Sequence, residues 1–256
     1  MKIATWNVNS VAARLARLTS WLADAQPDVV LIQETKSTDD RFPVAAIADA
    51  GYEVAHYGQG QWNGVAILSR VGVTDVQRGF GDQDPEARII GATCGGVRVY
   101  SCYVPNGRSL EDPHYRYKLD WLGRLGELAS TRPVGPFVLG GDFNVAPSDL
   151  DCWDPPSLLG ATHVSEPERA AIRAIESTGL IDLIRVLHPD EPAYSWWDYR
   201  GGAFHQNHGL RIDLLLVDET LGRRATAGYV DREARKGVKP SDHAPVIAEF
   251  DLESEG

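Results

Sequence analysis

Two kinds of hydrophobic pattern alternate along this chain, one with helical spacing and one of short continuous runs. In the first helical pattern, apolar residues recur every three to four positions, at Val11, Leu15, Leu18 and Leu22. Ser165 and Glu168 have the spacing of a capping box, which predicts a helix reaching Thr178, with Gly179 as its stop. Helices are also predicted over residues 43–50 and 114–129.

Short apolar runs bounded by turn residues predict the strands. Strands and helices are interspersed, and no long linker or low-complexity segment divides the chain. We therefore predict one α/β domain over residues 1–256, with two packed sheets and helices outside them. The predicted strands are residues 2–8, 29–32, 52–57, 65–69, 89–93, 97–103, 137–139, 194–197, 214–217 and 246–250.

Polar residues stand next to many of these strands, where a rigid scaffold presents functional groups. Each one alone has an ordinary explanation, such as a turn-forming asparagine or a solvated glutamate. Together they form a set of carboxylates, carboxamides, a phenol and an imidazole. Hard oxygen ligands of this kind suit Mg²⁺ or Mn²⁺ rather than zinc. The set comprises Asn7, Glu34, Tyr103, Asn106, Asp142, Asn144, Asp213, Asp242 and His243.

Hydrolysis of a phosphodiester needs groups of these types. A metal and hydrogen-bond donors can neutralise the phosphate charge. A positioned carboxylate can orient and deprotonate a water molecule. The departing oxygen needs a metal, a proton donor or both.

Composition narrows the setting of this chemistry. Of the 256 residues, 43% are hydrophobic and 24% are charged, which is ordinary for a globular protein with a large core. No apolar run is long enough to span a membrane, and the first residues lack a signal-peptide pattern, so we expect a cytoplasmic protein. Cys94, Cys102 and Cys152 are expected to be small buried residues in a reducing compartment.

The formal net charge of −11 argues, taken alone, against a nucleic-acid partner. The charge is unevenly distributed, however. Residues 223–239 contain an excess of basic over acidic side chains, which makes this stretch a candidate contact for a DNA backbone. A solvated face without a function is the alternative. The basic residues are Arg223, Arg224, Arg232, Arg235, Lys236 and Lys239, against Asp231 and Glu233.

Motifs along nearly the whole chain resemble those of the exonuclease III family. They follow the family's order, from residue 6 to residue 245, and an ordered set is far more specific than any one of them. That family belongs to the endonuclease/exonuclease/phosphatase superfamily, so the resemblance implies a DNase I-like four-layer α/β sandwich, with two packed mixed sheets flanked by helices. The matching segments are residues 6–10, 31–36, 63–69, 103–107, 141–146, 196–200, 210–216 and 241–245.

The resemblance also implies roles for the polar set. Glu34 matches the principal metal ligand, with Asn7 beside it, and Asp142 matches the carboxylate that activates water. His243 matches the imidazole that contacts the phosphate, and Asp213 the acid paired with it. Asn144 matches the amide that holds Asp142 or the phosphate, Tyr103 the phenol near the phosphate and leaving oxygen, and Asn106 a donor to the phosphate. Asp242 matches a ligand in a two-metal scheme. In that scheme Asp142, Asn144 and His243 would also touch metal. The sequence leaves the number of metals open.

Trp196, Leu210 and Ile212 match positions lining an apolar slot for a flipped abasic sugar. An abasic sugar has no base to unstack, so extruding it costs less than extruding an intact nucleotide. The alternative is that these are core residues. Arg108, like the basic stretch, is a candidate contact for the DNA backbone.

The resemblance thus implies a divalent-metal-dependent DNA-repair nuclease, associated with the nucleoid through DNA. A monomer is expected, because the sequence shows no heptad pattern and no large exposed apolar stripe. Its activities would be cleavage 5′ to abasic sites, together with 3′-to-5′ exonuclease and 3′-end cleaning on duplex DNA. One rival is a phosphatase or lipid phosphodiesterase on the same fold, which would need the polar set but not the apolar slot. Another is a non-catalytic DNA-binding module, which would be expected to have lost at least one catalytic position.

Overall fold

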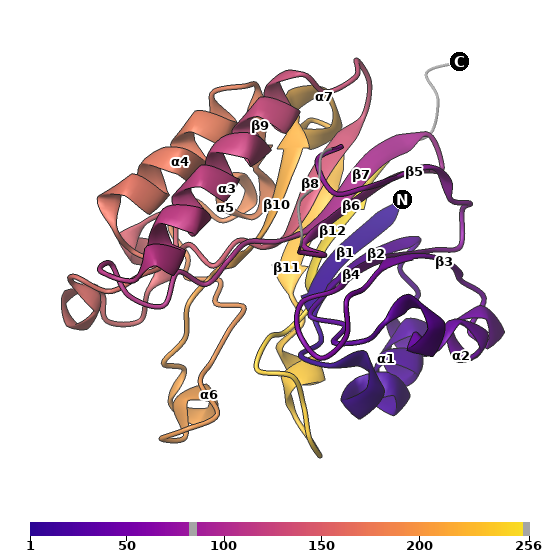
Figure 1. Cartoon of the computed structure of the whole chain (residues 1–256), viewed down its shortest axis with the longest axis horizontal. Helices are drawn as coiled ribbons and strands as arrows, with labels where there is room; N and C mark the ends of the chain where they lie inside the picture. The colour runs from indigo at the N-terminus through magenta and orange to yellow at the C-terminus, as the bar shows by residue number, and fades with distance from the viewer. Residues whose placement is uncertain (82–85, 253–256) are drawn as a thin grey trace.

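Two six-stranded mixed sheets pack face to face in the computed structural model, which describes residues 1–81 and 86–252 (Figure 1). The first sheet has the order β11-β12-β1-β2-β4-β3 and the second β5-β6-β7-β8-β10-β9. The strands are β1 (Lys2–Asn7), β2 (Val29–Gln33), β3 (Glu53–Tyr57), β4 (Val65–Ser69), β5 (Thr74–Arg78), β6 (Ile89–Cys94), β7 (Val97–Tyr103), β8 (Phe137–Asp142), β9 (Leu180–Asp182), β10 (Asp213–Asp218), β11 (Ala225–Val230) and β12 (Val246–Phe250).

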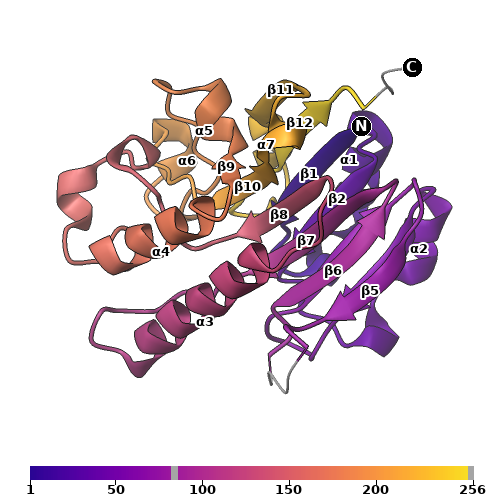
Figure 2. The same cartoon turned by 90° about the horizontal axis from the view of Figure 1, so that it is seen from above.

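Helices cover the outer face of each sheet. Residues of α1 and α2 join the core on the outer side of the first sheet, and residues of α3 and α4 do so on the second. Figure 2 shows α3 and α4 running side by side on that outer face. The helices are α1 (Val11–Ala25), α2 (Val44–Asp49), α3 (Pro113–Ser130), α4 (Glu166–Glu176), α5 (Leu183–Leu187), α6 (Ala203–Gln206) and α7 (Glu219–Gly222), and the 3-10 turns are η1 (Asp39–Arg41), η2 (Asp149–Asp151), η3 (Pro155–Leu158) and η4 (Arg232–Arg235).

The layer order is therefore helix, sheet, sheet, helix, and the predicted four-layer α/β sandwich is confirmed. Between the sheets lies a core that combines residues of both, including Leu31 and Ile67 of the first and Val99 and Leu215 of the second. The sheets approach closely at Gly140, where an added Cβ would lie 2.6 Å from Leu31 Cδ1. This close contact fixes the end of β8 against the first sheet.

The capping box is present as predicted. The Ser165 side chain accepts a hydrogen bond from the Glu168 N–H, and the Glu168 carboxylate accepts from the Ser165 N–H in return. Gly179 follows this helix with a φ of 91°, in the left-handed region that favours glycine at a helix end.

The predicted strand over residues 194–197 is wrong. Trp196 makes only isolated bridges, to Leu210 and to His243, because its backbone pairs with two loops rather than with a neighbouring strand. The sequence analysis also missed β5, β9 and β11. β5 and β11 are largely exposed edge strands, and β9 has only 3 residues, so none shows a clear apolar run.

Strand directions bring the polar strand ends to one edge of the sandwich. β1 and β2 are parallel, so Asn7 and the residue after Gln33 lie side by side. In the second sheet β7 is parallel to β8, which pairs Tyr103 with Asp142, and β10 is antiparallel to β8, which pairs Asp213 with the same Asp142. β12 runs antiparallel to β1, so its first residues lie near the end of β1.

Within residues 1–81 and 86–252, no helix combines the length and the apolar character that a membrane span requires.

Candidate active site

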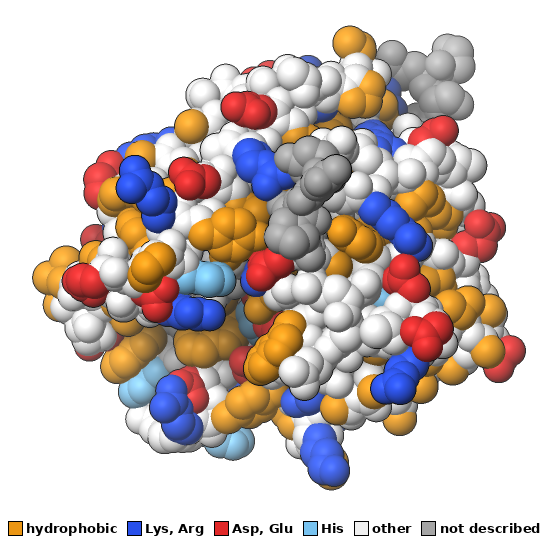
Figure 3. Space-filling model, in the orientation of Figure 1, with side chains coloured by type: hydrophobic (Ala, Val, Ile, Leu, Met, Phe, Trp, Pro, Cys, Tyr) orange, Lys and Arg blue, Asp and Glu red, His pale blue; other side chains and the backbone are white. Residues whose placement is uncertain are grey.

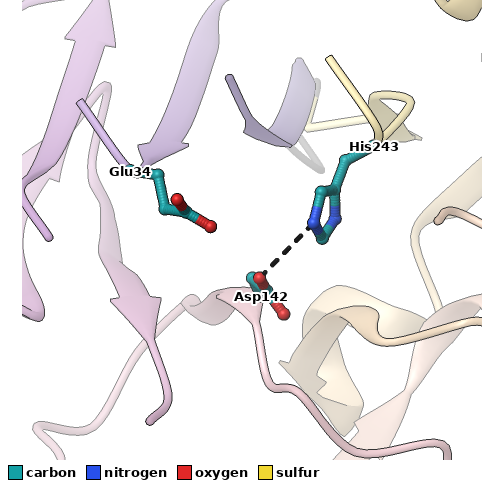
Figure 4. A group of neighbouring side chains, drawn as sticks. All are labelled: Glu34, Asp142 and His243. Atoms are coloured by element: carbon teal, nitrogen blue, oxygen red, sulfur yellow. Dashed lines mark ion pairs between the residues drawn. The ribbon is translucent and has the colours of Figure 1, made fainter. Parts of the chain in front are cut away.

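Glu34, Asp142 and His243 converge at this edge from three different strand ends (Figure 4). One potential ligand atom from each lies within 4.8 Å of the others. Asn7 Nδ2 bridges the two acids, donating to Glu34 Oε1 at 2.8 Å and to Asp142 Oδ2 at 2.9 Å. Lys36 Nζ lies 2.8 Å from the other oxygen of Glu34. The two carboxylates are thus held together on a shared amide donor.

His243 is held by Asp213 on its far side. Nδ1 of His243 donates to Asp213 Oδ2 at 2.8 Å, and the Ser195 hydroxyl donates to the same oxygen at 2.6 Å. Nε2 of His243 faces Asp142 Oδ2 at 3.7 Å. Burial alone would lower the pKa of His243, but the carboxylates of Asp213 and Asp142 raise it to about 10. The imidazole is therefore a cation near neutral pH.

Asp142 is buried near one cation, His243, and near two other carboxylates, Asp213 and Glu34. Burial raises its pKa, the His243 cation lowers it and the Asp213 carboxylate raises it again, with a net pKa of about 7. Asp213 Oδ1 is buried and has no hydrogen-bond partner among residues 1–81 and 86–252. Clustered oxygen donors with unsatisfied negative charge fit a hard divalent cation. Glu34 and Asp142 are the carboxylates placed to hold it, and the ion would supply charge neutralisation at the phosphate.

Tyr103 and the two asparagines lie on the second-sheet side of the cluster. Burial and the carboxylates of Glu34 and Asp142 raise the pKa of the Tyr103 phenol well above its usual range, so it remains a donor. Asn144, with a left-handed φ of 50°, donates its N–H to Asp142 Oδ1 at 2.9 Å. Its side-chain oxygen accepts from Asn106 Nδ2 at 3.2 Å. The backbone of Asn144 therefore orients Asp142.

Asp242 lies beside the cluster rather than in it. Its Oδ1 accepts from Asn9 Nδ2 at 3.0 Å and its Oδ2 from Trp196 Nε1 at 3.1 Å. Both oxygens are thus occupied by hydrogen bonds. The structure does not bring Asp242 into the group formed by Glu34, Asp142 and His243.

The predicted slot residues form a separate apolar cluster next to His243. Leu210 and Ile212 are 6% and 3% exposed and pack with Ala146 and Cys152, and Trp196 packs against them from a half-buried position. Figure 3 shows a hollow on this face, bordered by hydrophobic and histidine side chains above the loop that carries α6. Leu210 and Ile212 are thus almost entirely core residues, and Trp196 is the more exposed member of the cluster.

The predicted backbone contacts divide into exposed and inward-facing groups. Arg108 is exposed, with Nη1 3.8 Å from Asp112 Oδ2. In the basic stretch, Arg235 is buried, donates to the Trp197 carbonyl and stacks 5.0 Å over the Tyr199 ring. Arg235 therefore supports the loop structure and is not available to a DNA backbone.

Two residues that the sequence analysis did not single out contact the Asn144 carbonyl, the buried Lys118 and the half-buried His163. Lys118 Nζ donates to it at 2.7 Å, and His163 Nδ1 donates to it as well. Burial and the Lys118 ammonium lower the pKa of His163 to about 4, so this imidazole is neutral. Lys118 also pairs with Glu168. A lysine on the apolar stripe of a predicted helix was the available signal.

The chain belongs to the endonuclease/exonuclease/phosphatase family, whose sequence model matches residues 4–243. Within that family it is similar to exodeoxyribonuclease III of Haemophilus influenzae, at 34% identity over 98% of this chain and 100% of the relative. A Bacillus subtilis exodeoxyribonuclease is 33% identical, over 96% of this chain and 98% of the relative.

Solved structures agree with this assignment. The 3′-5′ exonuclease NExo of Neisseria meningitidis has a TM-score of 0.96 and 44% identity, covering 98% of this chain and 100% of its own. An AP endonuclease from Archaeoglobus fulgidus has a TM-score of 0.95 and 38% identity, with coverage of 98% and 100%. The predicted family and enzyme class are confirmed: the protein is a DNA-repair nuclease of the exodeoxyribonuclease III type, a hydrolase of DNA phosphodiester bonds.

Proposed function

We propose that the protein, acting as a monomer with Mg²⁺ or Mn²⁺, removes nucleotides and blocking groups from the 3′ ends of duplex DNA and cleaves 5′ to abasic sites. The observation that carries this proposal is the convergence of Glu34, Asp142 and His243 beside the apolar cluster. The carboxylates of this site outnumber its cations, which suits a divalent metal that in turn binds a phosphate, and the apolar cluster suits a sugar without its base.

In the proposed mechanism Asp142 accepts the proton of the attacking water, since its pKa, raised to about 7, lies near neutrality. His243, kept cationic by Asp213, donates from Nε2 to a non-bridging phosphate oxygen. Tyr103 remains protonated and donates on the leaving-group side. A bound divalent ion would neutralise the phosphate charge at Glu34.

Asn106 and Asn144 complete the phosphate side in this proposal. Their side chains are already joined by a hydrogen bond, which leaves the second Nδ2 hydrogen of Asn106 for a phosphate oxygen. Asp242 acts through its neighbours, because its two oxygens hold Asn9 and Trp196 in place.

The names of relatives support both kinds of substrate. A second NExo structure, described as a 3′ phosphatase bound to a product DNA hairpin, is 43% identical with a TM-score of 0.96, covering 98% of this chain and 99% of its own. The Archaeoglobus relative, named an AP endonuclease, is 38% identical. The higher identity to NExo favours 3′-end processing as the stronger activity.

The test uses four duplex oligonucleotides, carrying a recessed 3′ hydroxyl, a 3′ phosphate, one internal abasic analogue, or no modification. Each is incubated with and without Mg²⁺ or Mn²⁺, with Asp142→Asn as the inactive control. We expect metal-dependent loss of nucleotides and phosphate from the 3′ ends, and slower incision at the abasic position. If no duplex is cleaved while inositol phosphates or sphingomyelin are hydrolysed, the phosphatase or lipid rival replaces this proposal.

A further inference from the structure

The exposed ring of Trp153 stacks on the half-buried ring of His208. Their ring centroids are 3.8 Å apart with an interplanar angle of 12°, and Trp153 is 42% exposed. Across residues 1–81 and 86–252, neither ring makes a side-chain hydrogen bond or ion pair in the structure. A large aromatic ring that packs on another flat ring, and not into the core, keeps area free for a further flat partner.

Backbone pairing connects this pair to the active site. His243 bridges Trp196, Trp196 bridges Leu210, and Leu210 bridges Cys152, which directly precedes Trp153. Each rung of such a ladder spans about 5 Å, so the Cα atom of Cys152 lies at most roughly 15 Å from that of His243, and Trp153 is the next residue. In stacked DNA that distance corresponds to about four base steps. A strand held at His243 therefore reaches the stacked pair.

The segment that carries His208 is rigidly placed. Trp153 N–H donates to the Gly209 carbonyl at 3.1 Å, which ties the two loops together. Gly209 is packed so closely that an added Cβ would lie 2.5 Å from Trp197 Nε1 and 2.8 Å from Tyr194 Cβ. The stacked rings therefore stand on fixed backbone, and little conformational freedom is lost when a ligand stacks on them.

We propose that the Trp153–His208 pair is a stacking platform for an unpaired nucleobase of the DNA substrate, at a frayed or overhanging terminus near the cleaved bond. The proposal rests on the proposed function, which places DNA at His243. Every nucleobase has a flat face, so stacking on an aromatic side chain holds single-stranded DNA without selecting its sequence. The platform therefore recruits substrates with unpaired ends and leaves the chemistry of the cleavage step unchanged.

The test compares two duplexes, one with unpaired nucleotides at the cleaved terminus and one fully paired. For Trp153→Ala we expect KM on the unpaired substrate to rise roughly tenfold with kcat unchanged, and a smaller change on the paired duplex. Trp153→Phe should restore most of the loss, because phenylalanine keeps a stacking face. Tyr229→Ala is the matched control, since Tyr229 is 40% exposed but lies on β11.

A binding measurement separates this proposal from the proposed function. The inactive Asp142→Asn protein is mixed with DNA carrying 2-aminopurine at the unpaired position, and stacking should quench its fluorescence. Trp153→Ala, or His208→Ala if the first variant fails to fold, should remove the quenching. If wild-type protein cleaves DNA but both variants match Tyr229→Ala in KM and quenching, the platform is refuted and the proposed function stands. Failure of wild-type protein to cleave any DNA refutes both.

Discussion

Two buried clusters of charged side chains lie on either side of the Asn144 loop, and they differ in the balance of positive and negative charge. In the catalytic cluster, three carboxylates (Glu34, Asp142 and Asp213) lie with two cations, His243 and the Lys36 ammonium that pairs with Glu34, and Asp213 Oδ1 lacks a hydrogen-bond partner among the described residues. In the second cluster, Lys118 pairs with Glu168, and the side chains of both are 0% exposed. One cluster has excess negative charge and the other is neutral.

Hydrogen bonding completes the Lys118–Glu168 pair. Oε1 of Glu168 accepts from the Thr162 hydroxyl at 2.8 Å and from the His163 N–H at 2.9 Å. Oε2 accepts from the Ser165 N–H at 3.0 Å. Burial would raise the pKa of Glu168, but Lys118 and these donors lower it below its usual value. Lys118 reaches in turn to the Asn144 carbonyl, so this neutral pair supports the loop after Asp142.

The contrast explains what each cluster is for. A fully paired buried ion pair is a structural element, and breaking it leaves an uncompensated charge. A cluster with the pKa of one acid raised to about 7 is held under electrostatic strain that a cation or a phosphate-bound metal relieves. The Lys118–Glu168 pair thus supports the Asn144 loop, whose N–H holds Asp142 in place despite the excess negative charge around it.

The largest expected effect is on catalysis. Asp142→Asn should lower kcat by roughly 10²- to 10⁴-fold, because it removes the proton acceptor. Thermal stability in metal-free buffer should stay the same or rise, since the change removes one negative charge from a cluster that has too many. Incision rates and melting curves check both parts. A nearly full rate would mean that Asp142 is not the proton acceptor. A markedly lower melting temperature would mean that its charge stabilises the fold.

Breaking the Lys118–Glu168 pair should lower stability, in contrast to the change at Asp142. Lys118→Met leaves Glu168 buried without its cation and should lower the free energy of unfolding by about 3–5 kcal/mol. Replacing both residues with methionine should recover only part of that loss, because it removes the buried charge but leaves the donors of Thr162 and His163 without their acceptor. Urea unfolding of the two variants gives the comparison, with Leu125→Ala on the same buried face of α3 as a control for general destabilisation. Equal stability of the single and double variants would show that the pair is not a stabilising unit.

A smaller effect is expected from Glu34. Glu34→Ala should raise the metal concentration needed for half-maximal activity by at least about tenfold, because it removes one of the two carboxylates placed to hold the ion. Metal titrations of activity and of melting temperature measure this shift. Glu53→Ala, at an exposed position on β3, is the matched control. If both variants have the metal dependence of wild type, Glu34 is not a ligand.

The sequence predicted the layers and most of the strands because buried strands form continuous apolar runs. That Asn7, Glu34 and Asp142 belong to one site was implied by the resemblance to the exonuclease III family, and the strand ends of the structure do bring them together. The two-sheet register, which pairs Asp142 with both Tyr103 and Asp213, needed the structure. The roles predicted for these residues in catalysis and metal binding are still predictions.

The contacts that the sequence could not predict join segments that are distant in the chain. Lys118 and Glu168 belong to different helices, and their pairing under the Asn144 carbonyl follows from how those helices pack on the second sheet. The Trp153–His208 stack likewise depends on the isolated bridge between Cys152 and Leu210. The spacing of apolar residues and their helix or strand propensities describe one helix or strand at a time, so they carry no information on these contacts.

The pH dependence of stability should have opposite signs in the two clusters, through His243 in one and Glu168 in the other. The pKa of His243 is raised from 6.5 to about 10, so the folded state keeps a proton that the unfolded chain releases across this range. Its stabilising contribution is present below pH 6.5 and is lost as the pH rises toward 10, with a slope of at most ~1.4 kcal/mol per pH unit. The pKa of Glu168 is lowered, so its contribution is present above pH 4.5 and is lost in acid. The raised pKa of Asp142 acts in the same direction as that of His243 between pH 3.8 and 7. The unfolding free energy in metal-free buffer should therefore decline above pH 7 through His243 and below pH 4.5 through Glu168. His243→Ala should flatten only the alkaline side, and an unchanged alkaline decline in that variant would mean that the imidazole is not held as a cation by Asp213.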